Sequence, residues 1–144
     1  TQITPFSAAS EMARATETIS AIYTRWMADP AKFAQSQAEL VGAYAELWNR
    51  TVQRMFGVEP GPVIEPAPTD NRFRDPEWSK NPYFDFVKQA YLLTTKWAED
   101  NLAGTEGLDP ASRQKAEFYF RQLTSAFSPS NFPMTNPEVM RETM

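Results

Sequence analysis

The sequence predicts an all-α protein, in which a helical hairpin is joined by a proline-rich linker to a small helical unit. The first observation behind this prediction is that apolar residues recur at helical spacing along several long stretches. The second is that proline follows Asp or Asn where such stretches begin. The acidic or amide side chain can accept first-turn amides, and proline lacks the amide that would stay unpaired there. The pairs are Asp29-Pro30, Asn81-Pro82, Asp109-Pro110 and Asn136-Pro137.

The first 56 residues are expected to form two amphipathic helices. One covers about residues 7–28, and its apolar side carries Met12, Ile19, Ile22, Tyr23, Trp26 and Met27. The next begins at Pro30 and runs to about Phe56, where Gly57 stops it. Its stripe consists of Phe33, Leu40, Val41, Tyr44, Leu47, Trp48, Val52, Met55 and Phe56. Because neither helix can bury such a stripe alone, we expect them to pack as an antiparallel hairpin, on the second half of the chain, or on another molecule.

A proline-rich segment, residues 57–69, holds four prolines and two glycines and is expected to be a semi-rigid linker. It divides the chain into residues 1–56, 57–69 and 70–144, and the last unit is read as truncated at its C-terminal end. A third helix from Pro82 to Ala103 is apolar around most of its girth, which is typical of a central helix. A fourth helix runs from Pro110 to about Phe127, and a fifth opens at Pro137. The fourth is expected to turn Phe118, Phe120, Leu123 and Phe127 inward.

The composition restricts the chemistry that this chain can perform. It contains no cysteine and no histidine, so Cys-His and Ser-His-Asp catalysis are impossible within it. A net charge of −4 argues against nucleic-acid binding, which needs a surplus of Lys and Arg. No apolar run approaches the roughly 18–20 residues of a transmembrane helix. We therefore expect no catalytic residue, no metal site, no cofactor, no nucleic-acid partner and no transmembrane segment.

Two groups of charged residues permit other readings. Near pairs of carboxylates, such as Glu99 with Asp100, can support a hydrolase that acts through carboxylates alone. Adjacent helical residues point in different directions, however, so a solvated surface is favoured. The run Arg72-Phe73-Arg74 can bind an anion such as a CoA phosphate or a lipid headgroup. The favoured reading of that run is a surface loop anchored by Phe73 and Trp78.

From Asp70 onward, the sequence resembles the N-terminal domain of class I and II polyhydroxyalkanoate synthases. The resemblance covers about 75 residues and rests on several motifs in the same order. They are Asp70-Asn71-Arg72-Phe73, Trp78-Ser79-Lys80-Asn81-Pro82, Phe86-Val87-Lys88-Gln89-Ala90-Tyr91-Leu92-Leu93-Thr94, Arg113-Gln114-Lys115-Ala116, Phe120-Arg121-Gln122, Ser128-Pro129-Ser130-Asn131-Phe132 and Thr135-Asn136-Pro137-Glu138. Residues 1–57 resemble the variable helical front end of that family only loosely.

The resemblance implies a supporting role for this region. The family consists of acyltransferases that polymerise 3-hydroxyacyl-CoA into a polyester stored in cytoplasmic granules. Their catalytic Cys, His and Asp lie in a C-terminal α/β-hydrolase domain, so no catalytic residue carries over to this chain. The implied partners are the synthase catalytic domain, a second copy in a homodimer, and the polyester granule surface or its phasins. A free-standing phasin-like coat or adaptor protein is the alternative.

Two sets of residues are expected to carry these contacts. A docking core on the third and fourth helices would meet the catalytic domain or a second copy, and consists of Tyr91, Trp97, Phe118 and Phe127. An interaction face on the second helix would meet the granule, the polymer or a partner helix, and consists of Phe33, Leu40, Tyr44, Leu47, Trp48 and Phe56. Whether residues 1–56 fold back on residues 70–144 or project outward stays open at this point.

Overall fold

The computed structural model of the chain describes residues 5–132 and 136–138, and within them every regular element is helical. The long helices are α1 (Pro5–Met27), α2 (Pro30–Met55), α4 (Pro82–Ala103) and α5 (Pro110–Ala126). The short ones are η1 (Asn71–Phe73), α3 (Glu77–Lys80) and η2 (Pro129–Asn131). The predicted all-α class is confirmed. Pro137 and Glu138 are helical, but the rest of the expected fifth helix lies outside the described residues.

The helices begin where the Asp-Pro and Asn-Pro pairs predict. Asp29 accepts the backbone N–H of Lys32 at 3.2 Å, and Asn81 accepts that of Tyr83 at 2.9 Å. Asp109 caps α5 in the same way through the N–H of Ser112 at 2.7 Å. These side chains satisfy amides that have no partner inside the helix.

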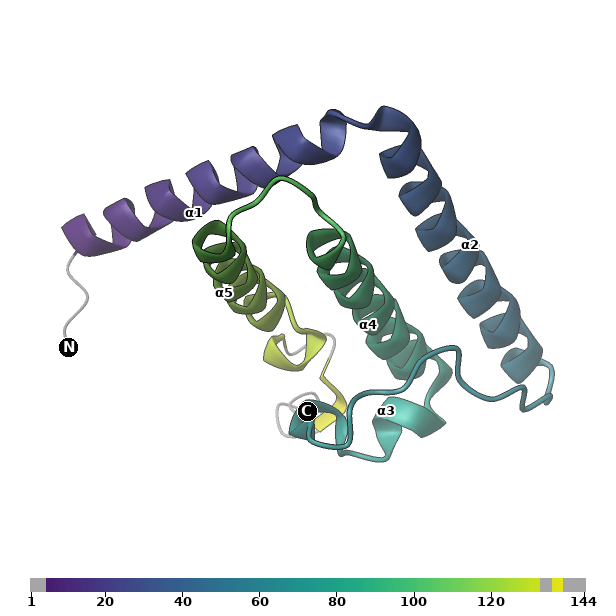
Figure 1. Ribbon diagram of the computed structural model, residues 1–144. Coiled ribbons are helices and arrows are strands. Elements are labelled where there is room, and N and C mark those ends of the chain that lie inside the picture. Colours follow the sequence, from purple (N-terminus) through teal and green to yellow (C-terminus); the bar gives the residue numbers. More distant parts are fainter. Residues whose placement is uncertain (1–4, 133–135, 139–144) are drawn as a thin grey trace.

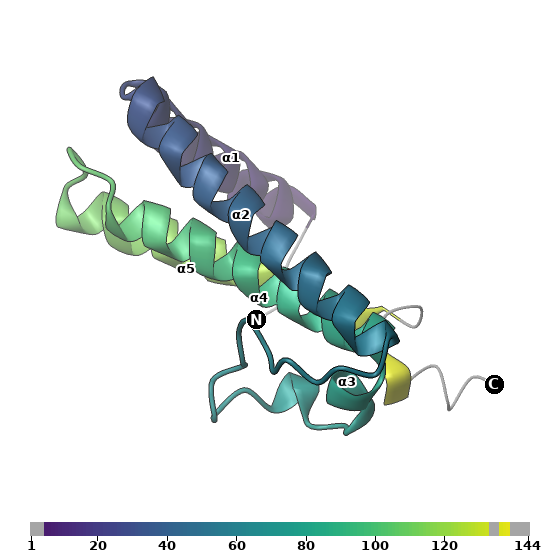
Figure 2. The same cartoon turned by 90° about the vertical axis from the view of Figure 1, so that its right-hand side faces the viewer.

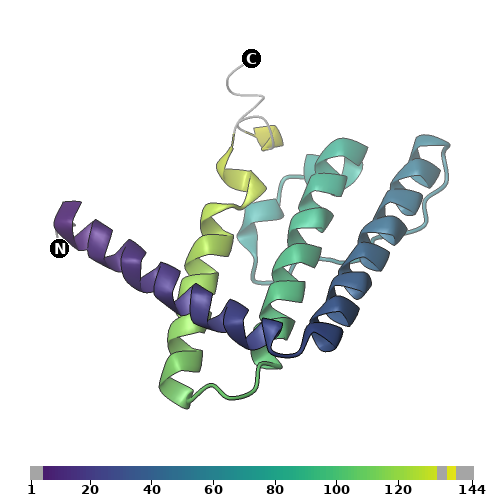
Figure 3. The same ribbon diagram turned by 90° about the horizontal axis from the view of Figure 1, so that it is seen from above.

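The long helices form two layers (Figures 1 and 3). In one layer α4 lies between α2 and α5 and runs antiparallel to both, while α1 crosses over α5 and the end of α4. The expected hairpin is therefore not formed, since α1 and α2 meet at an elbow around Asp29 instead of lying side by side. The reason is that each helix buries its apolar stripe on the second half. Leu47 of α2, in its packing against α4, and Ile22 of α1 are each only 1% exposed.

Two clusters of buried side chains make up the core. Phe73, Trp78, Phe84 and Leu92 join η1, α3 and α4 into one of them. The other consists of Ile22, Leu102 and Ala116, contributed by α1, α4 and α5, with Trp26, Leu108 and Phe120 packed around it. Helix α4 contributes to both clusters, which agrees with its predicted central position.

The proline-rich segment runs back along the molecule instead of standing free. After Gly57, whose φ of 86° suits glycine, it passes across α4 towards η1 (Figures 1 and 2). Ile64 packs against the cluster that contains Trp78. The division of the chain into three units stays a prediction. In this structure the segment is hydrogen-bonded to α2 through Arg50 and to α4 through Gln89.

One expectation about α5 is wrong. Phe118, Leu123 and Phe127 were expected inward, but they are 48%, 40% and 69% exposed. The buried face of α5 is instead centred on Ala116 and Tyr119. Consecutive helical residues are rotated by about 100°, so Phe118 points away from the face that holds Tyr119. Helix α1 crosses only part of α5 and leaves the C-terminal end of α5 uncovered (Figure 3).

Candidate functional site

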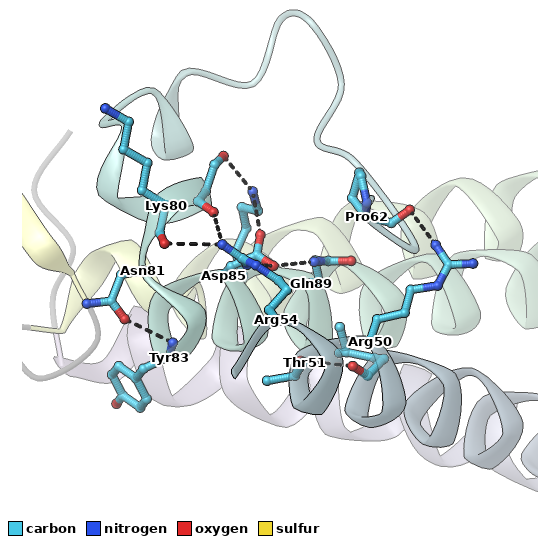
Figure 4. Close-up of polar contacts among 12 residues, drawn as sticks. Arg50, Thr51, Arg54, Pro62, Lys80, Asn81, Tyr83, Asp85 and Gln89 are labelled. Carbon is cyan, nitrogen blue, oxygen red and sulfur yellow. Dashed lines mark hydrogen bonds and ion pairs between the residues drawn. The ribbon is translucent and has the colours of Figure 1, made fainter. Parts of the chain in front are cut away.

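A cluster of charged and amide side chains lies between the proline-rich segment and the helices (Figure 4). Asp85 of α4 accepts one hydrogen bond from Arg54 of α2 at 2.7 Å and another from Gln89 at 2.6 Å. The ammonium group of Lys88 lies 3.2 Å from the other carboxylate oxygen. Asp85, Lys88 and Gln89 are all buried, with exposures of 7%, 5% and 3%. A buried carboxylate is thus paired on both oxygens, as burial of charge requires.

The same cluster holds the proline-rich segment in place. The side-chain oxygen of Gln89 accepts the backbone N–H of Val63 at 2.7 Å and that of Ile64 at 3.3 Å. Arg50 donates to the carbonyl of Pro62 at 3.0 Å (Figure 4). Extended backbone has no internal hydrogen bonds, so these side chains supply the partners that a helix or sheet would otherwise give.

Arg54 also fixes the end of α3. Its guanidinium donates to the backbone carbonyl of Ser79 at 2.7 Å and to that of Lys80 at 3.1 Å. A cavity of about 400 Å³ remains beneath the proline-rich segment, lined among others by Glu59, Glu65 and Lys88. Among the described residues, every buried side-chain nitrogen and oxygen has a hydrogen-bond partner. The geometry therefore serves to lock four segments together, and leaves no buried polar group aimed at a ligand.

A second polar group ties η1 to α4 and α5. Arg72 donates to both carboxylate oxygens of Asp70, at 2.9 and 2.8 Å, and to the hydroxyl of Tyr91 at 2.8 Å. Tyr91 in turn donates to the carbonyl of Thr124. The hydrogen bonds from the Arg72 side chain lower the pKa of Asp70, and the same contact raises the pKa of Arg72. Arg72 is thereby committed within the fold, which favours the anchored loop over an anion site. Phe73 and Trp78 are both buried, as that reading expects.

The elbow between α1 and α2 is held by stacked aromatic rings. Trp26 stacks on Phe33 with ring centroids 5.7 Å apart, and both meet Trp97 of α4, at 6.2 and 6.3 Å. The indole N–H of Trp97 donates to the carbonyl of Ser36 at 2.8 Å, and that of Trp26 to Thr105 at 2.7 Å. A cleft of about 530 Å³ opens beside these rings, and its rim mixes cations with carboxylates. The rings set the angle at which α1 leaves α2.

The carboxylate pairs do not converge. Asp100 forms an ion pair with Lys96 at 2.8 Å on the surface of α4. In the part of the chain that the structure describes, no group of three or more acidic residues is placed to hold a metal ion. No described helix is both long and apolar enough to span a membrane.

Comparison with known proteins identifies the family. Residues 69–144 match the family model described as Poly-beta-hydroxybutyrate polymerase (PhaC) N-terminus. The chain belongs to this family. A poly(3-hydroxyalkanoate) polymerase of Methylorubrum extorquens is 49% identical over 136 residues, which are 94% of this chain and 22% of the relative. A poly(3-hydroxyalkanoate) polymerase subunit PhaC of Rhizobium meliloti (strain 1021) is 45% identical over 131 residues, which are 89% of this chain and 21% of the relative. The chain thus spans about a fifth of the length of these polymerases, and no solved structure matches it.

The predicted docking core lies entirely within the region that matches the polymerase family. The structure separates its residues into two kinds. Tyr91 and Trp97 are half-buried and hold neighbouring elements to α4. Phe118 and Phe127 stand on the surface of α5. A docking role for these residues stays a prediction, in which α4 supplies the support and α5 the contact.

The predicted interaction face on α2 is divided as well. Phe33 belongs to the aromatic group at the elbow, Leu47 is buried, and the hydroxyl of Tyr44 is hydrogen-bonded to Thr94. Leu40 is half-buried. Trp48 and Phe56 are 57% and 83% exposed, so they form the part of the face that another surface can reach.

Sequence reasoning did not assign a role to the residues that hold the fold together. Asp85 drew notice only as part of the central helix, and Lys88 and Gln89 only as part of that helix and of a motif that carries the family resemblance. Their signal is their position between large apolar residues in the first turns of the central helix, where charged side chains are often buried with a partner. A buried charge needs a partner, and Arg54 supplies it from α2.

Proposed function

We propose that this chain is the non-catalytic N-terminal region of a polyhydroxyalkanoate polymerase, and that it supports the catalytic part of that enzyme. The parent enzyme would be an acyltransferase that polymerises 3-hydroxyacyl-CoA. The observation that carries the proposal is that a chain covering about a fifth of such polymerases contains neither Cys nor His. The groups that most often serve as nucleophile and general base must then come from elsewhere in the enzyme.

Support here means docking on the catalytic part and stabilising its active dimer. The geometry suits such a role because the helices are fixed to one another by buried polar groups and stacked rings, so that they present surfaces of defined shape. On α5, Phe118 and Phe127 are 48% and 69% exposed. Exposed aromatic side chains of this kind are frequent anchors of protein interfaces.

A second role, attachment to storage granules in the cytoplasm, is favoured by the end of α2. Met55, Phe56 and Val58 are 62%, 83% and 51% exposed within four consecutive residues. An apolar patch of this kind is commonly an interaction site. The proposed partner is the polyester surface or a phasin that coats it.

The alternative function, a free-standing phasin-like coat or adaptor, rests on the same exposed patch. The polymerase reading is preferred because the two relatives described above are both polymerases and align with nine-tenths of this chain. Reading the parent gene beyond Met144 discriminates the two. A long open frame that encodes a Gly-x-Cys-x-Gly box supports the polymerase, and an early stop supports the adaptor.

The supporting role is tested by adding this chain to a separately expressed polymerase catalytic domain. CoA release from 3-hydroxybutyryl-CoA is followed while light scattering sizes the complexes. We expect the chain to be inert alone, and to shorten the lag or promote dimers of the catalytic domain. The variant Phe118→Ser/Phe127→Ser should weaken this effect at least about fivefold, if these rings are interface anchors. Met12→Ser, at an exposed position of α1, is the control. A chain that neither binds nor changes the rate would contradict the proposal.

Granule attachment is tested separately by co-sedimentation with polyester particles. Phe56→Glu/Val58→Glu should abolish binding, and Tyr23→Glu, at a site 55% exposed on α1, should leave it intact. Replacing Leu47 instead would not be informative, because this side chain is buried against α4 and a charge there would disrupt the fold. Binding that survives the change at Phe56 and Val58 would rule this patch out.

A further inference from the structure

Helix α2 carries a second apolar stripe beside the face that packs on α4, and at the edge between the two the ring of Trp48 meets that of Phe86 of α4, with centroids 5.9 Å apart. Its members alternate in spacing between four and three residues, which is the heptad pattern of a helix that pairs with another helix. Six of the seven are exposed and Val52 is half-buried. They are Ala34, Ala38, Val41, Ala45, Trp48, Val52 and Met55. We call this stripe the outer seam.

The outer seam is free of charge and mostly exposed, with Trp48 in contact with Phe86 of α4 along one edge. None of its residues is charged, and neither are the positions that border it, which are Gln35, Gln37, Gly42, Tyr44, Asn49, Thr51 and Phe56. Val41, Trp48 and Met55 are 65%, 57% and 62% exposed. Helix α2 forms one outer edge of the molecule, and no other described element lies in front of it when that edge faces the viewer (Figures 1 and 2).

We infer that the outer seam pairs with the outer seam of a second copy of this chain, with the two helices antiparallel. The inference rests on the proposed function, in which this region supports a dimer, and it names the surface that does so. In an antiparallel pair, each seam position of one helix faces the complementary position of the other. The register that places Trp48 against Ala45 of the second copy also places Met55 against Ala38 and Val41 against Val52.

The sizes of these side chains are what select this arrangement. The two largest residues, Trp48 and Met55, then each meet an alanine and the two valines meet each other, so the two surfaces are self-complementary about a two-fold axis that passes between Glu46 and Leu47. A parallel pair would instead place Trp48 on Trp48 and Met55 on Met55, and would leave Ala38 facing Ala38 across a gap. Bulk at one end and a void at the other give poor packing.

Charge argues against an anionic lipid surface as the occupant. Interfacial helices that bind such surfaces carry Lys and Arg beside their apolar stripe. The row beyond the uncharged border of the outer seam instead holds Glu39 and Glu46 together with Lys32, and Arg50 is committed to Glu46 at 2.8 Å, so this side of α2 has no surplus of Lys and Arg. An uncharged protein surface is the better match, and a second seam of the same kind supplies one.

The size of the seam sets the strength of the pairing. A stable interface uses about 20–30 residues on each side. The seven seam residues fall well short of that number. The pairing should therefore be reversible and dependent on concentration in the isolated chain, and other parts of the polymerase would reinforce it.

Sedimentation of the chain over a range of concentrations tests the pairing. We expect a monomer–dimer equilibrium that Val41→Glu/Trp48→Glu abolishes, because the pairing would then bury like charges. Met12→Glu/Tyr23→Glu, at exposed apolar positions of α1, should leave the equilibrium unchanged. Circular dichroism establishes that both variants stay helical. A chain that is monomeric at all concentrations, or a dimer that survives the seam variant, overturns the inference.

Spin labels test the direction of the helices, and the absence of cysteine makes single labels possible. With a rise of 1.5 Å per residue, labels at Asn49→Cys lie about 8 Å apart along the helix axis in the antiparallel pair. Labels at Gln35→Cys lie about 35 Å apart along the axis by the same reckoning. Parallel helices would give equal short distances at both positions, and that result would overturn the antiparallel arrangement.

These outcomes are distinct from a failure of the proposed function. A monomeric chain that still activates the catalytic domain would refute the seam pairing alone. A dimer that has no effect on the catalytic domain would refute the supporting role alone. A monomer that sediments with polyester particles, and loses this binding in Val41→Glu/Trp48→Glu, would assign the outer seam to the polymer and overturn the pairing.

Discussion

The side-chain oxygen of Gln89 accepts the backbone N–H of Val63 at 2.7 Å, and so joins the central helix to a segment of extended chain. The amide nitrogen of the same side chain donates to Asp85 at 2.6 Å. One buried side chain thus connects the proline-rich segment to the ion pairs that hold α2 on α4. The order of that segment therefore depends on the core and not on its own composition.

Gln89→Ala should loosen the proline-rich segment without unfolding the helices. The change leaves the N–H groups of Val63 and Ile64 without their acceptor, at a cost of about 1–3 kcal/mol if they stay buried. Hydrogen exchange of these two amides should become faster. Gln122→Ala, at an exposed position of α5, is the control and should change neither stability nor exchange. Unchanged protection of Val63 would mean that the segment is held by other contacts.

Asp85→Ala should lower the free energy of unfolding far more than the loss of a surface ion pair does. Arg54 and Lys88 would remain in the interior without their counter-charge, which costs about 3–5 kcal/mol. Glu46→Ala removes a partner of Arg50 whose side chain is 49% exposed, and should cost under about 1 kcal/mol. Urea unfolding of both variants measures the difference. Equal effects would show that the buried cluster does not stabilise the fold.

Much of the helical layout could be predicted from local chemistry. Asp29, Asn81 and Asp109 determine helix starts through contacts with the residues that follow them, so their effect is legible in the sequence. The central place of α4 could also be predicted, because a helix that is apolar around most of its girth is covered on several sides.

The packing partners could not be predicted, because the sequence of a single helix does not tell which of its apolar faces packs against a neighbouring helix. The apolar surface of α2 extends from Leu47 round to Trp48 and Val41, and the sequence does not say which part meets α4. On α5, the small Ala116 is what lies fully buried at the meeting of α1 and α4, and large rings such as Phe127 stay outside. The proline content of residues 57–69 predicts a linker. It does not reveal that Ile64 packs against the core, because that contact depends on the tertiary structure.

Stability should depend on pH through Asp70. Hydrogen bonds from Arg72 lower the pKa of this carboxyl in the folded chain. A lowered pKa means that the stabilisation is complete above the unfolded value of about 3.9, and is lost as the pH falls through the folded value. The stability difference between the natural chain and Asp70→Asn should therefore be constant near neutral pH and shrink in acid. Urea unfolding at a series of pH values measures it, and a difference that persists unchanged at the most acidic pH would exclude this linkage.

Two glycines give opposite predictions for the same substitution. Gly42 lies inside α2, and a Cβ added there meets no atom within 4 Å. Gly42→Ala should therefore stabilise the chain by about 0.5–1 kcal/mol, because alanine loses less backbone entropy on forming a helix. Gly107, in the loop before α5, has a φ of 81°, and a Cβ added there would lie 2.6 Å from the guanidinium of Arg25.

Arg25 is long enough to move aside, but the backbone at Gly107 is not a conformation that alanine readily adopts. Gly107→Ala should therefore destabilise the chain by about 1 kcal/mol or more. Thermal unfolding of the two variants, side by side with the natural chain, should shift the midpoint up for Gly42→Ala and down for Gly107→Ala. Shifts of the same sign would mean that the loop before α5 adopts another conformation in solution. The contact of Arg25 of α1 with that loop would then also differ in solution.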